Sequence, residues 1–214
     1  MSISVLLIGA TGLVGNLTLQ KLLQNNEISE VRIITRRETG IVHEKLKELV
    51  IDFERLHEFK AFMQGDVLIN CLGSTMKKAG SKASFERFDH YYPLEIAKIC
   101  RENGTKRMIL LSAMGAKKDA IFFYNRIKGL LELDCESLGF ESLMILQPSL
   151  ISGNRNEHRP MEKIANAFFS IITPLLPDKI KQVSAHVLAN TILKLSVESN
   201  EKGTNRIRFK NFVH

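Results

Sequence analysis

A tyrosine and a lysine four residues apart form the first pair in this sequence whose types and spacing suit chemistry. Tyr124 and Lys128 share one face if their segment is helical. An ammonium beside a phenol favours the phenolate, so the tyrosine can exchange a proton with a carbonyl or an alcohol. Ser112 ends an expected strand, where ligands bind in parallel sheets. Ser112, Tyr124 and Lys128 are therefore candidate catalytic residues; the alternative is a surface Tyr–Lys pair and a buried serine.

A glycine-rich segment follows the first expected strand, Ile3–Ile8, and opens the first expected helix, Leu13–Leu23. Gly9 permits a tight turn, Gly12 lets the backbone approach a pyrophosphate, and Gly15 lets the helix pack closely on the strand. The helix N-terminus adds N–H groups and a partial positive charge. The spacing G-x-x-G-x-x-G departs from the common G-x-G-x-x-G, so the signal depends on this strand–loop–helix context. It predicts a dinucleotide site, with a ligand-free turn as the alternative.

The end of the second expected strand, Val31–Thr35, favours NADP(H) over NAD(H). An NAD site uses a carboxylate there to hold the ribose hydroxyls. This sequence has Arg36 and Arg37 instead, and guanidinium groups pair with a 2′-phosphate that a carboxylate would repel. The alternative is that both arginines only solvate the strand end. Asp52 and Phe53 follow the third expected strand and border the adenine, unless Asp52 is a helix N-cap.

Short β-branched runs alternate with longer amphipathic stretches, which predicts βαβ units and a parallel sheet covered on both faces. Further strands are expected at Leu49–Asp52, Val67–Asn70, Met108–Leu111 and Leu143–Leu146, and further helices at Phe85–Glu102 and Phe122–Ser137. Beyond Pro148 the sequence predicts a loop, two helical stretches and a strand-like piece at Arg206–Phe209. We expect one α/β domain over 1–214, a Rossmann-type doubly wound parallel sheet with helices on both faces. Residues 149–214 add a small C-terminal lobe on the substrate side.

The amino-acid composition bears on the classes of partner that the protein could bind. The 214 residues include 30 Lys and Arg against 23 Asp and Glu, a formal net charge of +7. Lys77, Lys78, Lys82, Lys117 and Lys118 are the nearest approach to a basic patch. No basic segment interleaved with aromatic residues accompanies them, so we do not expect nucleic acid as a partner.

The three cysteines, Cys71, Cys100 and Cys135, are odd in number and form no C-x-x-C. With no metal-ligand spacing among the histidines, we expect no disulfide framework and no metal, and a reducing, cytoplasmic location. The longest apolar stretch, Ile164–Leu176, is too short to span a bilayer. The N-terminus lacks the basic region of a signal peptide.

Several segments in order along the chain resemble an atypical short-chain dehydrogenase/reductase, in particular its Tat-interactive-protein-like branch. Besides the glycine loop, Ser112 and the Tyr124–Lys128 pair, they are 71–75, 78–81, Asp89-His90, 110–112, 115–116, 124–129 and 148–155 with Glu157 and Arg159. The resemblance implies an NADP-binding Rossmann fold with Tyr124 and Lys128 as the catalytic pair. Lys128 would also hold the nicotinamide ribose. The implied cofactor site contains Gly9, Thr11, Gly12, Leu13, Val14, Arg36, Leu72 and Gly73.

This sequence departs from that family pattern at two positions. Ala113 stands where relatives have a second serine, and Gln147 stands where they have arginine. Both changes bear on turnover more than on cofactor binding. The first hypothesis is an NADP(H)-dependent oxidoreductase acting on a small carbonyl or alcohol. Related folds are commonly homodimers, but no residue of this sequence argues for a homodimer. Phe122, Phe123, Phe168 and Phe169 suggest an apolar substrate, although phenylalanines are more often core. The second hypothesis is a catalytically weak NADP(H)-binding regulatory or redox-sensing protein, which Ala113 favours.

The arginine pair leads to a direct prediction about cofactor choice. Titration of the purified protein, followed by fluorescence or calorimetry, should show tighter binding of NADPH than of NADH, because Arg36 pairs with the 2′-phosphate. Equal affinity for the two would remove the role given to the arginines. Binding of neither would remove the dinucleotide site altogether.

Overall fold

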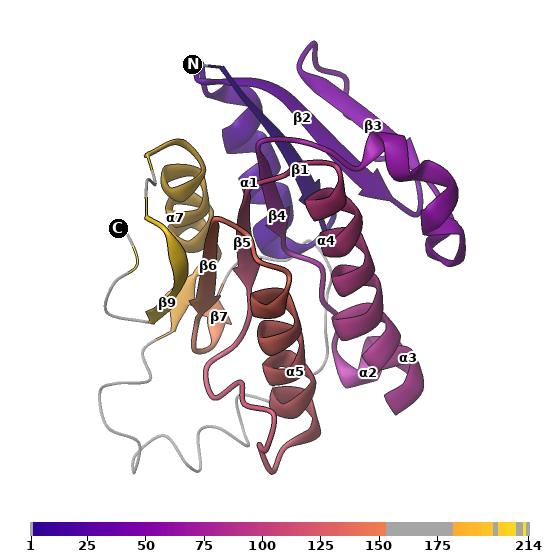
Figure 1. Ribbon diagram of the computed structural model, residues 1–214, viewed down its shortest axis with the longest axis vertical. Coiled ribbons are helices and arrows are strands. Elements are labelled where there is room, and N and C mark those ends of the chain that lie inside the picture. The colour runs from indigo at the N-terminus through magenta and orange to yellow at the C-terminus, as the bar shows by residue number, and fades with distance from the viewer. Residues whose placement is uncertain (1, 153–181, 199–200, 209–211, 213–214) are drawn as a thin grey trace.

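A seven-stranded parallel sheet forms the centre of the molecule (Figure 1). The computed structural model describes residues 2–152, 182–198, 201–208 and 212. The strand order is β3-β2-β1-β4-β5-β6-β9, and every neighbouring pair is parallel. The strands are β1 Ile3–Ile8, β2 Ile28–Thr35, β3 Leu46–Val50, β4 Val67–Asn70, β5 Arg107–Leu111, β6 Ser142–Gln147 and β9 Gly203–Arg208. The order reverses direction between β1 and β4, and ligands bind at the carboxyl ends of strands at such a point.

Helices cover both faces of this sheet, as the sequence predicts for a doubly wound fold. Helices α1 (Leu13–Gln24) and α7 (Ala185–Glu198) pack together on one face. Helices α4 (Tyr92–Glu102) and α5 (Phe123–Ser137) lie side by side on the other, with the 3-10 segment η1 (Phe53–Phe62) against α4. Three short helical pieces precede α4: α2 Met76–Ala79, α3 Lys82–Glu86 and the π-helix η2 Arg87–Tyr91.

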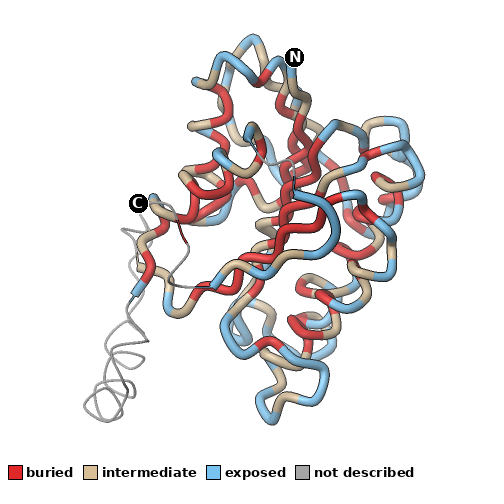
Figure 2. The backbone as a smooth tube through the Cα atoms, turned by 60° about the vertical axis from the view of Figure 1, so that its left-hand side comes forward, coloured by how far each residue is buried: buried red, intermediate tan, exposed pale blue. Residues whose placement is uncertain are grey.

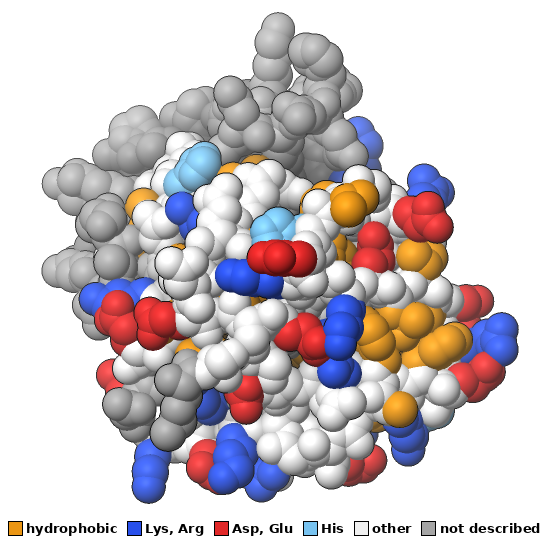
Figure 3. All heavy atoms as spheres, turned by 90° about the horizontal axis from the view of Figure 1, so that it is seen from above, with side chains coloured by type: hydrophobic (Ala, Val, Ile, Leu, Met, Phe, Trp, Pro, Cys, Tyr) orange, Lys and Arg blue, Asp and Glu red, His pale blue; other side chains and the backbone are white. Residues whose placement is uncertain are grey.

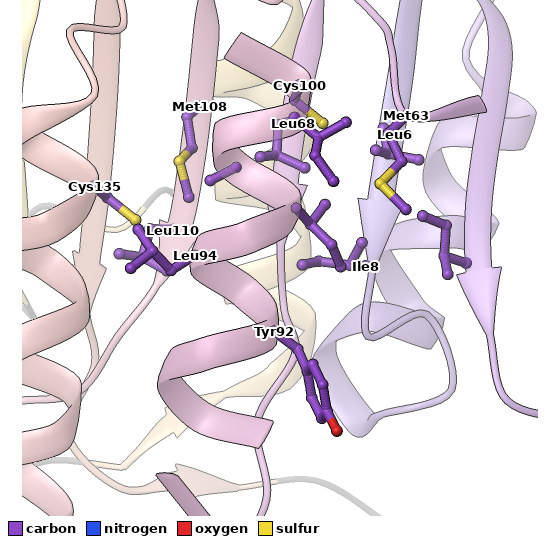
Figure 4. Close-up of a cluster of buried hydrophobic side chains, with 14 of the residues drawn as sticks. Leu6, Ile8, Met63, Leu68, Tyr92, Leu94, Cys100, Met108, Leu110 and Cys135 are labelled. Carbon is purple, nitrogen blue, oxygen red and sulfur yellow. The ribbon is translucent and has the colours of Figure 1, made fainter. Parts of the chain in front are cut away.

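The core consists of two apolar layers, one on each face of the sheet. Strands β1, β4, β5 and β6 supply buried side chains to both, so the buried backbone runs through the middle of the fold (Figure 2). In the layer under α4 and α5, Leu6, Leu68 and Met108 from the strands face Cys100 and Cys135 from the helices (Figure 4). Strands that are apolar on both sides are expected for a sheet covered on both faces.

The two edge strands differ from their predicted ranges. The third strand was expected at Leu49–Asp52 and lies at Leu46–Val50, while the last was expected at Arg206–Phe209 and lies at Gly203–Arg208. Each edge strand pairs on one side only and alternates exposed and half-buried residues. Neither edge strand therefore has a continuous apolar run from which its first and last residues could be predicted. Asp52 lies beyond β3, where it caps η1.

The single helix expected at Phe85–Glu102 is divided into α3, η2 and α4. Pro93 stands at the start of α4 and has no N–H to donate to the carbonyl of Asp89. The chain instead forms a π turn, in which the N–H of Tyr92 donates to the carbonyl of Arg87. Such wider turns are frequent at functional sites.

Part of the segment expected as a C-terminal lobe joins the main fold. Strand β9 extends the central sheet, and α7 packs on α1. The short strands β7 (Ile151–Ser152) and β8 (Val183–Ser184) pair with each other. Phe168, Phe169, the apolar stretch Ile164–Leu176 and the motif residues from Gly153 to Arg159 lie outside the described residues. Among those described, no helix is long and apolar enough to cross a membrane.

Charges of both signs mix on the end of the molecule where the strands begin (Figure 3). Ion pairs such as Lys106–Glu141 and Lys47–Glu30 occur near the strand starts. On this face, therefore, neither sign of charge gathers into a single patch.

Candidate functional site

The glycine loop forms a tight turn between β1 and α1. Gly9 has φ +81°, a left-handed conformation that favours glycine, and its carbonyl accepts a hydrogen bond of 3.0 Å from the N–H of Gly12. Gly12 is the N-cap residue of α1, and its own carbonyl accepts the first helical bond, from Asn16 at 2.8 Å. The N–H groups of the first helical turn therefore point out of the end of α1.

Two of these glycines allow backbones to approach each other closely. A Cβ on Gly9 would lie 2.4 Å from the carbonyl carbon of Cys71, the residue after β4. A Cβ on Gly15 would lie 2.1 Å from the carbonyl oxygen of Gly9. Neither position has room for a side chain. The sequence-based roles of Gly9 in the turn and Gly15 in close packing agree with this geometry.

A hollow of about 800 Å³ opens at the carboxyl ends of β1, β4 and β5. The glycine loop, the segment after β4, the end of β5 and helix α5 each contribute to its wall. The lining residues are Thr11, Gly12, Leu13, Val14, Asn16, Leu17, Cys71, Leu72, Gly73, Ser74, Thr75, Lys78, Asp89, Leu111, Ser112, Tyr124, Lys128, Ile151 and His186. Most of the residues expected to bind cofactor and all three candidate catalytic residues thus share one cavity.

The walls of this hollow suit a dinucleotide. The end of α1 presents N–H donors and a partial positive charge, which pyrophosphate oxygens require. Gly12 leaves the backbone bare at that point, since a Cβ there would meet only the Gly9 carbonyl oxygen at 3.3 Å. Across the hollow, Gly73 has no side chain to fill the space above Lys128.

Tyr124 and Lys128 lie on the face of α5 that borders the hollow. Their environments differ: the Tyr124 side chain is partly exposed, whereas Lys128 is 4% exposed. The ring of Tyr124 packs against Phe85 with 5.7 Å between centroids, which holds the phenol at the cavity wall. The four-residue spacing therefore brings both groups to one site, as the sequence predicts.

An aspartate that the sequence analysis gave no role holds the lysine. The Lys128 Nζ lies 2.9 Å from Oδ1 of Asp89, which is fully buried on η2. Oδ2 of Asp89 accepts two hydrogen bonds of 2.8 Å, from the N–H and the hydroxyl of Ser74. Burial lowers the pKa of the Lys128 ammonium, but the attraction of Asp89 and Tyr124 outweighs burial, and the net pKa is raised. The lysine is therefore a fixed, charged group.

The Ser112 hydroxyl is engaged with a second buried acid. It donates to Glu132 of α5, whose carboxylate also accepts two bonds of 3.0 Å from the Gln147 amide. Arg206 of β9 lies 3.3 Å from Glu132 and supplies the balancing positive charge. A hydroxyl whose proton points at Glu132 offers only lone pairs to any other neighbour.

A second hollow, of about 380 Å³, adjoins the end of β2 and contains Arg36 and Phe53. The Arg36 guanidinium lies 5.0 Å from the ring centroid of Phe88. Asp52 also lines this hollow, and its side chain accepts a bond of 3.0 Å from the N–H of Glu54, so it is a helix N-cap. Of the two roles left open for Asp52, the cap is seen directly.

Arg87 and Glu54 of this second hollow form an ion pair that the sequence did not suggest. Tyr92 also donates to Glu54, and burial together with this bond raises the pKa of Tyr92 to about 12. Arg37, in contrast, lines neither hollow.

The sequence does contain signals that could have identified Asp89 and Glu132, the two buried acids that the sequence analysis gave no role. Asp89 interrupts an otherwise apolar helical face that contains Phe85, Tyr92 and Ile96, and a buried acid there requires a partner. Glu132 follows Lys128 by four residues, so it continues the face that carries the candidate pair. Among the described residues, no cluster of His, Cys, Asp or Glu could hold a metal ion.

A family model, related sequences and solved structures all resemble this chain in ways that agree with a nucleotide-binding site. The family model described as NAD(P)H-binding matches residues 9–131. Protein HTATIP2 of Rattus norvegicus is 38% identical over 170 residues, covering 78% of this chain and 70% of that protein. A mitochondrial protein fmp52 of Aspergillus niger is 34% identical over 176 residues, covering 79% and 75%. The crystal structure of the oxidoreductase ylbE from Lactococcus lactis superposes with a TM-score of 0.69 at 19% identity, covering 96% and 89%.

The glycine geometry predicts unequal effects of two alanine substitutions. Gly9 and Gly40 both have positive φ, but no heavy atom lies within 4 Å of a Cβ on Gly40. Gly40→Ala should therefore cost about 1 kcal/mol in the free energy of unfolding, from backbone strain alone. Gly9→Ala should cost about 3 kcal/mol or more, because it also forces Cys71 away. Urea denaturation measures both, and equal losses would contradict the close approach.

The thiol of Cys71, on the wall of the larger hollow, should react slowly with iodoacetamide. Burial raises its pKa from 9.0 to about 12, although Lys128 lowers it in part. The thiolate is the reactive form, so the rate should increase about tenfold per pH unit through pH 10 without levelling near 9. Peptide mapping identifies the site, and urea-unfolded protein is the control. Rapid labelling at neutral pH would contradict the raised pKa.

Proposed function

Because this chain belongs to the NAD(P)H-binding family, within the atypical short-chain dehydrogenase/reductase type, we propose that it is an NADP(H)-dependent oxidoreductase acting on a small carbonyl or alcohol. One observation carries the proposal: Tyr124 and Lys128 line the same hollow as the glycine loop. A proton-transferring group and the expected place of a dinucleotide therefore share one cavity of about 800 Å³.

The cofactor would lie across the carboxyl ends of the strands. The N-terminus of α1, with Thr11, Gly12, Leu13 and Val14 around it, would hold the pyrophosphate. Leu72 and Gly73 would border the half that carries the nicotinamide, where Lys128 would donate to the ribose.

At the other end, Arg36 would pair with the 2′-phosphate of NADP(H) while stacked on Phe88. Phe53 would border the adenine, and Asp52 would support that wall as the cap of η1. Gly9 and Gly15 would act through the shape of the loop. Arg37, which lines neither hollow, would contribute charge from further away.

Residues on this chain would handle the proton. A reduced nicotinamide held in the hollow would supply the hydride that converts the carbonyl to an alcohol, and would itself be oxidised. Tyr124 donates its hydroxyl proton to the carbonyl oxygen, and solvent at the mouth of the hollow returns a proton to the phenolate. Lys128 fixes the ribose and stabilises the phenolate that forms.

The described part of 149–214 would serve the substrate side of one domain spanning 1–214. Ile151 and His186 both line the hollow, the first from β7 and the second from the start of α7. The proposed location is the cytoplasm, where reducing conditions suit Cys71, Cys100 and Cys135, which are all free thiols.

A regulatory NADP(H)-binding protein is the second candidate, and the serine position favours it. Ser112 directs its proton to Glu132, and Ala113 has no hydroxyl. Of the two hydroxyls that would polarise a substrate oxygen, the one on Ser112 is therefore bonded to Glu132 and the one at position 113 is absent. Turnover would then depend on Tyr124 alone for hydrogen bonding to the carbonyl.

Tyr124→Phe distinguishes the two candidates. It should lower NADPH-dependent reduction of a panel of small aldehydes and ketones by at least about 10²-fold, because the proton donor is lost. NADPH affinity, measured by calorimetry, should stay within a few-fold. Tyr91→Phe is the matched control, since Tyr91 is partly exposed and outside the hollow, and it should leave the rate unchanged.

Equal rates for Tyr124→Phe and the unaltered protein would overturn the catalytic role of Tyr124. NADPH binding by the unaltered protein without turnover of any carbonyl would favour the regulatory candidate.

A further inference from the structure

The carboxylate of Asp89 is fully committed to the protein interior. Its side chain is 0% exposed, and it meets three donors: the ammonium of Lys128 and two groups of Ser74. A buried charge of this kind is stable only when it is paired and hydrogen-bonded, as here. The three donors come from α5 and from the segment after β4, so Asp89 joins the two walls of the larger hollow.

The local backbone is arranged to place this carboxylate. Pro93 produces the π turn that contains Asp89, and Gly73 leaves the space that the ion pair occupies. A Cβ on Gly73 would lie 3.2 Å from both Asp89 Oδ1 and Lys128 Nζ. Two local features therefore serve one ion pair at the edge of the proposed cofactor site.

The pair changes what Lys128 does to its neighbour. An isolated ammonium favours the phenolate of a nearby tyrosine, whereas a carboxylate 2.9 Å from that ammonium carries the opposite charge and opposes this effect. Lys128 can still donate to a ribose, because an ammonium has three N–H donors and the ion pair with Asp89 does not need all of them.

We propose that Asp89 is a positioning residue that fixes the Lys128 ammonium and balances its charge, so that Tyr124 keeps its proton and acts as proton donor in carbonyl reduction. This inference rests on the proposed function and adds a direction to it. A tyrosine that stays protonated at neutral pH suits reduction of a carbonyl with a reduced cofactor, whereas alcohol oxidation requires the phenolate as base.

Three other titratable groups line the hollow around this pair and Tyr124. Cys71 lines the hollow beside Lys128, and burial raises its pKa to about 12, so its thiol is neutral. Lys78, from α2, and His186, from α7, complete the titratable lining together with Tyr124 itself. Asp89 is therefore the one carboxylate among the described lining residues.

A charge series tests the proposal in the protein without cofactor. The readout is the near-ultraviolet absorbance of the Tyr124 phenolate, obtained as the difference between each protein and the same protein carrying Tyr124→Phe. Asp89→Asn should move phenolate formation to lower pH, by on the order of one unit, because Lys128 is no longer balanced. Lys128→Met should move it to higher pH, because Asp89 is left unbalanced. The double variant should return close to the unaltered protein.

This order of the pH values of phenolate formation follows the charge that each variant leaves near Tyr124. Loosened packing would not shift the two single variants in opposite directions. The double variant also carries no unpaired buried charge, so it should fold even if a single variant does not. Asp134→Asn is the matched control: it removes a nearby carboxylate that pairs with His90 at 2.6 Å and is outside the lining of the hollow. It should leave phenolate formation unchanged.

The proposal would be overturned if the Tyr124 phenolate formed at the same pH in Asp89→Asn as in the unaltered protein. It would also be overturned if the pH of phenolate formation in the double variant were raised as far as in Lys128→Met. The reductase activity, measured with NADPH and a carbonyl that the protein reduces, should fall at alkaline pH as Tyr124 loses its proton. In Asp89→Asn this fall should occur at lower pH than in the unaltered protein, by the same number of pH units as the shift in phenolate formation. If the unaltered protein reduces no carbonyl, the proposed function fails, but the order of the phenolate titrations still decides the role of Asp89.

Discussion

The close approach of two backbones at the carboxyl ends of β1 and β4 is the constraint on which the site depends. The strands are paired in parallel up to Ile8 and Asn70, and the N–H of Cys71 donates to the Ile8 carbonyl at 2.9 Å. Gly9 then turns against Cys71 with no space for a Cβ, and α1 starts four residues later, at Leu13. This contact sets the distance between the end of α1 and the Leu72–Gly73 segment, which are opposite walls of one hollow.

Helix α5 connects that hollow to the interior through a row of polar side chains. Tyr124, Lys128 and Glu132 are spaced by four residues, so they lie along one face, from partly exposed to buried. Each of the two buried charges on the helix has an opposite charge from another element: Asp89 for Lys128 and Arg206 for Glu132. Removing one member of such a pair leaves an uncompensated buried charge, which is why both pairs hold α5 in one position.

The sequence predicted the layered fold and the turn at the glycine loop well, because both depend on local patterns. Fully buried strands such as Val67–Asn70 have an unbroken apolar run, and the glycine loop has a fixed spacing. The edge strand Leu46–Val50 was misplaced because two of its five residues are exposed and the other three are only partly buried. Asp89 was missed as a partner of Lys128 because 39 positions separate them and only the tertiary fold brings η2 against α5. Likewise, nothing local indicates that the Ser112 hydroxyl meets Glu132.

The partners of Glu132 link two positions on neighbouring strands. Gln147 on β6 offers Glu132 an uncharged amide, and Arg206 on β9 offers the guanidinium. Gln147 in turn accepts a hydrogen bond of 3.2 Å from Arg208, which is also on β9. Both arginines that support this group of buried side chains therefore come from β9, and the outermost strand becomes a part of the site's electrostatic support.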